Sequence, residues 1–351
     1  MVSSASPRPA HRRSRRAWIA IPLLLAVTAA ACGGDDDDAD AGGDSSGGEK
    51  ITLGYSAWPG WAPWAVTEEA GIFDEVGLDV ELKWFDDYIG SLDAMAAGQI
   101  DANSQTLNDT LVGVSSGSAQ TVVIVNDNSA GNDAIIVDES ISSIEDLAGK
   151  DVAAEAGVVD HFLLLQGLES VGLTEDDINF QGLLTDQAAA TFSGGELDAV
   201  GVFAPFTVQA LERPNSKVLF DSSDFPGTIP DFLAMDSALV EERPEDVQKL
   251  VDAWYMTLDY IEENPEESAE IMAERLGVSV EEYNDFASGT KLFPAETALE
   301  SLNGDAETDL PKMTDTVNTF LVDSGLLEEE ADTEGLYDTT FTEDYVEREG
   351  Q

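Results

Sequence analysis

Aromatic rings are the side chains of this sequence best placed to bind a ligand. Three tryptophans (Trp58, Trp61 and Trp64) crowd the stretch from Gly54 to Phe73, and the Pro-Gly pair after Trp58 favours a loop between a strand and a helix. Loops that follow strands hold the ligands of many α/β sheets. Trp58 is therefore a candidate ligand contact, whereas Trp61 and Trp64, three residues apart, fit a buried helix face equally well.

Carboxyl groups are the second kind of candidate. Asp127, Asp133 and Asp231 lie at the ends of expected strands or at expected crossings between lobes, although in a chain with 71 acidic residues a single Asp is more often solvated than functional. Tyr88 also follows a strand end and could add a ring to the same cleft. Rings attract planar or cationic groups and carboxylates pair with amines, so these residues together favour a small solute with a nitrogen group.

The sequence offers few groups for catalysis or metal binding. After residue 31 it contains one histidine, His161, and one cysteine, Cys32. One histidine without a partner cysteine does not form a usual zinc site, and no nucleophile, base and orienting residue can be assembled around it. His161, with Asp160 beside it, fits helix capping or packing. We therefore expect no enzymatic activity, no metal and no cofactor.

The first 49 residues are typical of an export signal followed by a tether. An arginine-rich head precedes the apolar run from Ala17 to Ala31, which predicts a signal peptide over residues 1–31, of either the general secretory or the twin-arginine type. Cys32 then follows small residues and resembles the bacterial lipobox, which predicts a lipid anchor on the outer face of the cytoplasmic membrane. Residues 32–49 form an acidic disordered tether, because from Gly33 onward they contain no apolar side chain but alanine.

The charge of the chain excludes two classes of partner. Of 16 basic residues, five lie in residues 1–31, which leaves 11 basic against 71 acidic residues and a formal charge of −60 after that point. Nucleic acid and anionic membrane surfaces would both be repelled. An excess of this size, spread over most expected helices, favours a soluble surface in a saline environment over a cation site.

The pattern of elements predicts two α/β lobes. Apolar strands alternate with amphipathic helices from Ile51 onward, and from Pro244 the spacing becomes helical. A helix closed by glycine and followed by a short strand occurs at residues 92–102 and again at residues 188–199. Two copies about a hundred residues apart indicate two similar lobes, and the gap between such lobes is a natural ligand cleft.

An ordered set of short motifs lies along residues 51–326: Gly54…Trp58-Pro59-Gly60…Gly71-Ile-Phe, Ala97-Gly98-Gln-Ile-Asp101, Leu147-Ala-Gly149-Lys150-Asp-Val-Ala, Gly157, Gly194…Asp198-Ala and Pro205. The set resembles the substrate-binding proteins of ABC importers in the nitrate, sulfonate and taurine class, which also includes carriers of thiamine pyrimidine precursors. The resemblance implies a two-lobed periplasmic-binding-protein type II (Venus-flytrap) fold with hinge crossings near residues 132–137 and 229–236. Lobe I would comprise residues 50–134 and 235–326, lobe II residues 135–234, and residues 327–351 would be an acidic C-terminal tail.

The resemblance also implies where a ligand would bind. Trp58 matches the first-loop contact of the family, and the helix that begins at Gly157 could hold an anion with its free N–H groups. Two motifs differ from those of many relatives, since Gly157-Val158 lacks a hydroxyl and Phe203-Ala204-Pro205 lacks a carboxylate. The complete set of candidate ligand contacts is Trp58, Trp61, Tyr88, Gln105, Thr106, Asp127, Asn128, Gly157, Asp160, His161 and Asp231.

These observations predict the solute-binding component of an ABC importer. We expect a monomer that binds a small organic sulfonate or amine, such as taurine or an alkanesulfonate, and delivers it to a permease in the cytoplasmic membrane. An aminopyrimidine thiamine precursor or nitrate is the alternative ligand. A pyrimidine-synthase-like enzyme on the same fold is the alternative function, and a sensor ectodomain would need a membrane-spanning helix after the lobes.

Overall fold

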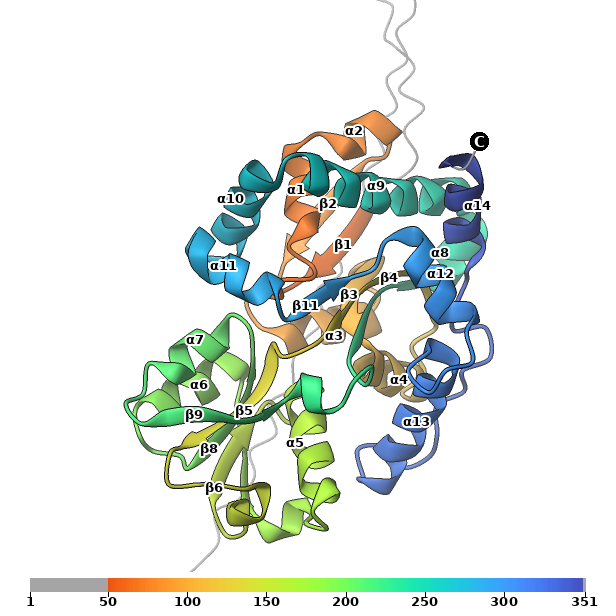
Figure 1. Ribbon diagram of the computed structural model, residues 1–351. Coiled ribbons are helices and arrows are strands. Elements are labelled where there is room, and N and C mark those ends of the chain that lie inside the picture. Colours follow the sequence, from red (N-terminus) through yellow and green to blue (C-terminus); the bar gives the residue numbers. More distant parts are fainter. Residues whose placement is uncertain (1–49, 350–351) are drawn as a thin grey trace, which may run out of the picture. The chain divides into compact units, whose positions relative to one another are not determined.

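A computed structural model of the protein describes residues 50–349, which belong to one compact unit beginning at Ser46. The predictions for the signal peptide, for Cys32 and for the tether therefore lie outside the described residues. Strands and helices alternate along the described chain and build two separate sheets (Figure 1). The α/β class predicted from the alternation is confirmed.

The first sheet has six strands in the order β11-β4-β10-β3-β1-β2. Strand β1 lies parallel to β2 and β3, whereas β10 lies antiparallel to β3 and β4, and β11 antiparallel to β4. Side chains of β10, β3 and β4 are buried on both faces of the sheet, as is usual for strands covered by helices. The strands are β1 (Ile51–Tyr55), β2 (Val80–Trp84), β3 (Ala102–Thr106), β4 (Gln120–Ser129), β10 (Pro230–Asp236) and β11 (Thr290–Leu292).

The second sheet has five strands in the order β7-β6-β8-β5-β9. Strand β6 lies parallel to β7 and β8, and β5 lies antiparallel to β8 and β9. The strands are β5 (Asp133–Asp138), β6 (Asp151–Ala154), β7 (Asn179–Gly182), β8 (Ala199–Phe203) and β9 (Ser216–Asp221). Three helices pack on this sheet, α5 (Val159–Ser170), α6 (Thr185–Ser193) and α7 (Phe206–Leu211), with short 3₁₀ turns at Ile144–Leu147, Glu175–Asp177 and Ser222–Asp224.

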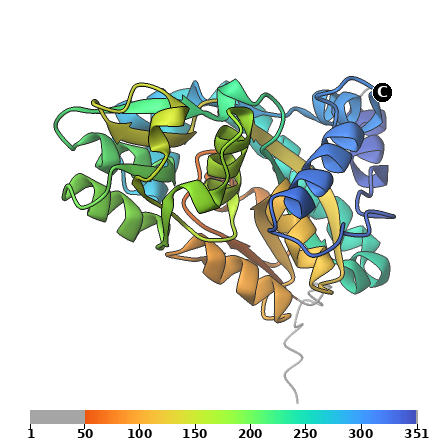
Figure 2. The ribbon, with the colours of Figure 1, turned by 90° about the horizontal axis from the view of Figure 1, so that it is seen from below.

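The other helices belong with the first sheet, and Figure 2 shows them from a second direction. The longest, α9, buries Val247, Leu250, Val251 and Trp254 at the three-and-four spacing predicted from the sequence. It ends at Asn264, before the proline that begins α10. These helices are α1 (Pro63–Glu69), α2 (Ile72–Val76), α3 (Tyr88–Ala96), α4 (Leu107–Ser115), α8 (Ser237–Glu242), α9 (Pro244–Glu263), α10 (Pro265–Leu276), α11 (Val280–Ala287), α12 (Ala295–Asn303), α13 (Leu310–Asp323) and α14 (Thr340–Glu349).

The described backbone passes between the two sheets twice, at residues 130–132 and 225–229. Both passages lie slightly earlier than the predicted hinges, because β5 belongs wholly to the second sheet and β10 wholly to the first. Hydrogen bonds link the two connections: the Ser222 hydroxyl accepts from the Gly131 backbone at 2.7 Å and lies 2.7 Å from the Ser129 hydroxyl, and the Ser129 backbone donates to the Ile229 carbonyl at 2.9 Å. Gly131 has a φ of 128°, a conformation that glycine adopts without strain.

Residues 327–349 pack on the first sheet and its helices, in contrast to the acidic tail predicted for residues 327–351. Leu336 and Asp338 exchange backbone hydrogen bonds with Val122 of β4. Phe341 is buried and Tyr345 stacks on Tyr255 of α9 with ring centroids 5.0 Å apart. The three anchors seen in the sequence, Leu336, Tyr337 and Phe341, are enough to bind this acidic segment because each finds an apolar partner.

Candidate functional site

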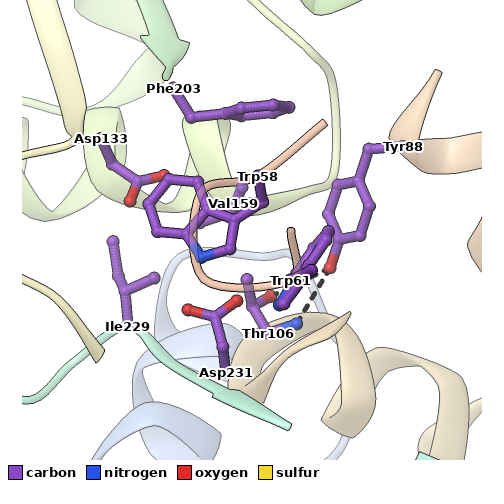
Figure 3. Close-up of a pocket in the computed structure, with 9 residues that line it drawn as sticks. All are labelled: Trp58, Trp61, Tyr88, Thr106, Asp133, Val159, Phe203, Ile229 and Asp231. Atoms are coloured by element: carbon purple, nitrogen blue, oxygen red, sulfur yellow. Dashed lines mark hydrogen bonds between the residues drawn. The ribbon is translucent and has the colours of Figure 1, made fainter. Parts of the chain in front are cut away.

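A small cavity is lined by residues from both sheets (Figure 3). The centre of a water-sized sphere can reach about 10 Å³ of it, roughly the space that one water molecule needs. The described conformation is therefore closed, and any larger solute requires the walls to separate. The lining consists of four rings, two carboxyls, one hydroxyl and two aliphatic side chains: Trp58, Trp61, Tyr88, Phe203, Asp133, Asp231, Thr106, Val159 and Ile229.

Strand register brings the polar lining residues together. In the first sheet Asp231 lies between Thr106 of β3 and Asp127 of β4, so three strand ends place their side chains side by side. In the second sheet Asp133, the first residue of β5, pairs with Phe203, the last residue of β8. The two antiparallel pairings explain why residues far apart in the sequence line one cavity.

The rings form a continuous aromatic wall. Trp61 packs on Trp58 and on Tyr88, with ring centroids 6.3 and 5.4 Å apart, and Phe203 of the second sheet lies 6.3 Å from both Trp58 and Tyr88. Trp64 instead packs on Trp254 and donates its indole N–H to Ser104 in the core. Of the two tryptophans that the sequence could not separate, Trp61 lines the cavity and Trp64 is a core residue.

The loop after β1 is held against Asp127. The indole N–H of Trp58 donates to Oδ1 of Asp127 at 3.0 Å, and both residues are buried. Gly60 makes this approach possible, because a Cβ atom there would lie 1.9 Å from Oδ2 of the same carboxyl. Asp127 therefore acts on the site by positioning Trp58, and it does not line the cavity itself.

Tyr88 and Thr106 are fixed by a second buried carboxyl, Asp109. The Thr106 hydroxyl donates to Asp109 at 2.7 Å, while its backbone N–H donates to the Tyr88 hydroxyl at 3.0 Å. Burial raises the pKa of Tyr88 well above its usual range, so this hydroxyl stays neutral. The Thr106 and Tyr88 side chains are thus held by partners within the protein.

Burial raises the pKa of every carboxyl at the site. It raises the pKa of Asp133, and likewise that of Asp109, to about 7, because the charged forms lose hydration. Asp127 and Asp231 are neighbours on paired strands, and burial raises the pKa of both. The charge of Asp127 raises the pKa of Asp231 further, because two neighbouring buried carboxyls do not readily ionise together. The site is thus acidic without being fully ionised.

The start of α5 is occupied by groups of the protein itself. The Gly157 backbone N–H donates to Nδ1 of His161 at 3.2 Å, and Nε2 of His161 lies 2.6 Å from Glu175. Asp160 is buried and accepts from the Thr185 hydroxyl at 3.1 Å. None of Gly157, Asp160 and His161 lines the cavity. Burial lowers the pKa of His161, against the opposing effect of Glu175.

Two further predicted contacts, Gln105 and Asn128, face away from the cavity. The Gln105 amide donates to Thr110 and Gln120 inside the first lobe, at 2.9 and 2.7 Å. Asn128 lines a separate surface cavity beside Lys291 and Phe293. Gln105 precedes Thr106 and Asn128 follows Asp127 by one position. Because neighbouring strand residues point to opposite faces, Gln105 and Asn128 are directed away from the site.

Four lining residues were not in the predicted set of contacts: Asp133, Val159, Phe203 and Ile229. Phe203 stands in the Phe-Ala-Pro motif that differs from the Trp-Glu-Pro of many relatives, and this departure was the available signal. Asp133 had been weighed only as one acid among many. Its pairing with Phe203 across β5 and β8 is what places it at the site.

The two α/β sheets, the two backbone passages and the cavity between them define the periplasmic-binding-protein fold. The chain belongs to the NMT1-like family, which matches residues 44–277. A binding protein of Brucella abortus (strain 2308) is 27% identical over 277 residues, which are 77% of this chain and 85% of that protein. The taurine-binding periplasmic protein of Escherichia coli (strain K12) is 26% identical over 192 residues, which are 55% of this chain and 54% of that protein.

Solved structures share the fold at lower sequence identity. The alkanesulfonate-binding protein SsuA from Xanthomonas axonopodis pv. citri, bound to MOPS, superimposes with a TM-score of 0.69 and 17% identity, covering 82% of this chain and 98% of that one. The ligand-binding component of an ABC-type import system from Staphylococcus aureus has a TM-score of 0.69 and 15% identity, covering 85% of this chain and 99% of that one. The predicted fold and its resemblance to importer binding proteins are thus confirmed.

Within residues 50–349, no helix is long and apolar enough to cross a membrane. No group of three or more His, Cys, Asp or Glu side chains there is arranged to hold a metal ion.

Proposed function

We propose that this protein is the extracytoplasmic solute-binding component of an ABC importer. The observation that supports this function best is the cavity itself, which is walled by Thr106 and Asp231 of one sheet and by Asp133 and Phe203 of the other. Because only two backbone passages join the sheets, a hinge motion would open the cavity and admit a solute. The closed form would then present both lobes to a permease.

The solute is a small organic molecule with a nitrogen group, from the range of sulfonates and amines that the relatives and the site chemistry suggest. Taurine-binding and alkanesulfonate-binding proteins among the relatives support the class of solute. The four rings support a planar or cationic group, since stacking and cation–π attraction are strongest in a desolvated site. Taurine and an alkanesulfonate are the specific candidates, and an aminopyrimidine or the inorganic anion nitrate is the alternative.

A thermal-shift screen of the purified protein tests the function. A solute that binds only the folded protein must raise its melting temperature, by an amount that grows with concentration. The screen should contain taurine, alkanesulfonates, nitrate, aminopyrimidines and simple amines. We expect at least one to stabilise the protein and, in solution scattering, to reduce its radius of gyration. A protein that no small solute stabilises would not be a solute receptor.

The lipid anchor is a separate part of the proposal. Cys32 would carry the lipid and hold the protein on the outer face of the membrane. Fractionation of cells that express the Cys32→Ala variant should show the protein released from the membrane. The neighbouring change Gly33→Ala, which keeps the cysteine, is the control and should leave the protein bound. A Cys32→Ala protein that stays in the membrane fraction would show another means of attachment.

A further inference from the structure

We propose that the cavity accepts an organic cation with N–H donors, such as an alkylammonium or an amidinium, and rejects sulfonates and other anions. This narrows the solute class of the proposed function and rests on it. The proposal follows from the free hydrogen-bonding atoms at the site, from its charge, from the start of α5 and from the rings.

Free acceptors are the first observation. Asp231 and Asp133 are each only 1% exposed, yet Oδ2 of Asp133 has no hydrogen-bond partner, and the Asp231 oxygens have none besides the neighbouring Asp127 carboxyl. Both residues line the cavity, and Figure 3 shows their carboxyls directed into it. A buried carboxyl without a donor is costly. A ligand with several N–H groups would satisfy these oxygens when it binds.

Free donors are scarce by comparison. Among the lining side chains, only the Trp61 indole N–H lacks a partner in the described structure. Trp58 already donates to Asp127, and Thr106 to Asp109. One indole N–H cannot satisfy the three oxygens of a sulfonate, but it suits a single hydroxyl or carbonyl elsewhere on a cationic solute.

The charge of the site also favours a cation over an anion. None of the lysines and arginines in residues 50–349 lines the cavity. Arg213, Arg275 and Lys312 pair with carboxylates elsewhere, at Asp138, Glu68 and Glu307. An anion in the cavity would lie beside Asp133 and Asp231 without a positive partner, whereas a cation would be attracted by both.

The start of α5 is not available to an anion. Its Gly157 N–H already donates to His161, and the Val159 N–H is a hydrogen-bond partner of the Asp109 carboxyl. Asp160 lies within its first turn, with its side chain buried. Carboxyls of the protein itself therefore occupy the place where an anionic group would otherwise benefit from the helix N-terminus.

A matched series of small probes tests the charge preference. Acetamidinium, acetamide and acetate have similar shapes and differ in charge, and benzamidinium, benzamide and benzoate repeat the comparison with a ring. At pH 8 we expect each amidinium to bind at least about tenfold more tightly than its neutral amide, because hydrogen bonds to charged groups are the strong ones. Acetate, benzoate, methanesulfonate and taurine should not raise the melting temperature. Ethylammonium extends the series to a non-planar cation.

Variants locate the preference in the cavity. Asp231→Asn and Asp133→Asn keep the shape of the side chain and remove its charge, and each should weaken amidinium binding by about tenfold or more. The same changes should raise the melting temperature of the unliganded protein, an effect that a merely structural role would not produce. The control is Asp160→Asn, an equally buried acid outside the cavity. It should leave amidinium binding unchanged.

The outcomes separate this inference from the proposed function. If methanesulfonate or taurine stabilises the protein and no amidinium or ethylammonium does, the cation preference is overturned while the solute-binding function stands. Equal binding of amide and amidinium would show that the rings alone select the ligand, which also overturns it. If Asp160→Asn weakens amidinium binding as much as the cavity variants do, the effect comes from buried charge in general. In that case Asp231 and Asp133 would not be the carboxyls that bind the cation.

Discussion

The start of α5 and the cavity are both built from buried carboxyls, but they differ in how those carboxyls are satisfied. At the start of α5, the Thr185 hydroxyl lies 2.6 Å from Glu155 and 3.1 Å from Asp160, each of which keeps one oxygen without a partner, and His161 joins Glu175 to the Gly157 backbone. In the cavity, Asp231 has no hydrogen-bond partner besides the neighbouring Asp127 carboxyl. Carboxyls that accept hydrogen bonds from hydroxyl and imidazole groups of the protein stabilise the fold, whereas carboxyls without such donors are suited to a ligand that supplies them.

Trp58→Ala is expected to have the largest effect on stability and on solute binding, because it changes the cavity in two ways. It removes a ring that is 4% exposed and leaves Oδ1 of Asp127 without its donor. Loss of a buried tryptophan typically lowers the free energy of unfolding by about 3–5 kcal/mol. Chemical denaturation should show this loss, and calorimetry should show that solute binding is abolished.

The Trp58→Phe variant is the control, since it retains a ring and removes only the N–H. Its free energy of unfolding should fall by about 1–3 kcal/mol, the cost of leaving the Asp127 carboxyl without its donor. This loss is smaller than the one expected for Trp58→Ala. Equal stability of both variants with the wild-type protein would show that Trp58 does not hold the loop against Asp127.

The stability of the unliganded protein should fall as the pH rises from about 4 to about 7. Burial raises the pKa of Asp109 and Asp133 to about 7, and in this window the unfolded protein has already lost the protons that the folded protein keeps. Each pKa unit corresponds to about 1.4 kcal/mol. Burial raises the pKa of all the acids in and around the site, so each of them contributes to this decrease in stability with rising pH: Asp109, Asp127, Asp133, Glu155, Asp160 and Asp231.

Urea denaturation at several pH values would measure this dependence. The Asp133→Asn variant should show a shallower slope between pH 4 and 7, because one of the raised groups is gone. A saturating amidinium should also reduce the slope, since a cation stabilises the ionised carboxyls. Stability that increases with pH over this range would contradict the assignment of raised pKa values.

Thr185→Val tests the satisfied side of the comparison. The single hydroxyl proton of Thr185 is shared between Glu155 at 2.6 Å and Asp160 at 3.1 Å, so its removal takes a donor away from two buried carboxyls. We expect the free energy of unfolding to fall by about 1–3 kcal/mol. Solute affinity should not change, and Thr185→Ser should restore the stability. A large loss of affinity in Thr185→Val would show that the α5 start takes part in binding.

Salt should have the smallest effect on stability, and this effect is specific neither to the cavity nor to the start of α5. After residue 31 the chain carries 11 basic and 71 acidic residues, a formal charge of −60, and like charges repel in the folded state. Screening at molar NaCl should raise the melting temperature relative to low salt. Potassium chloride is the control for a specific sodium effect. A melting temperature independent of salt would indicate local compensation of the charges.

The sequence by itself determined the architecture and part of the cavity. Alternating apolar strands and amphipathic helices are local patterns, and they predicted the two-lobed α/β fold. The Pro-Gly pair after Trp58 predicted a loop at the site for the same reason, because it restricts the backbone locally. Trp58, Trp61, Tyr88, Thr106 and Asp231, all predicted as ligand contacts, do line the cavity.

Only the tertiary structure decided which neighbouring side chain faces the cavity and which partners satisfy it. Thr106 lines the cavity and Gln105 does not, because successive strand residues point to opposite faces and only the register between β3 and β10 selects the face. Asp160 and Asp231 look alike in the sequence, but Asp160 lies 3.1 Å from the Thr185 hydroxyl, whereas Asp231 has only the Asp127 carboxyl beside it. Hydrogen-bond partners from distant strands and helices depend on the fold, so no local pattern could separate the structural carboxyl from the one available to a ligand.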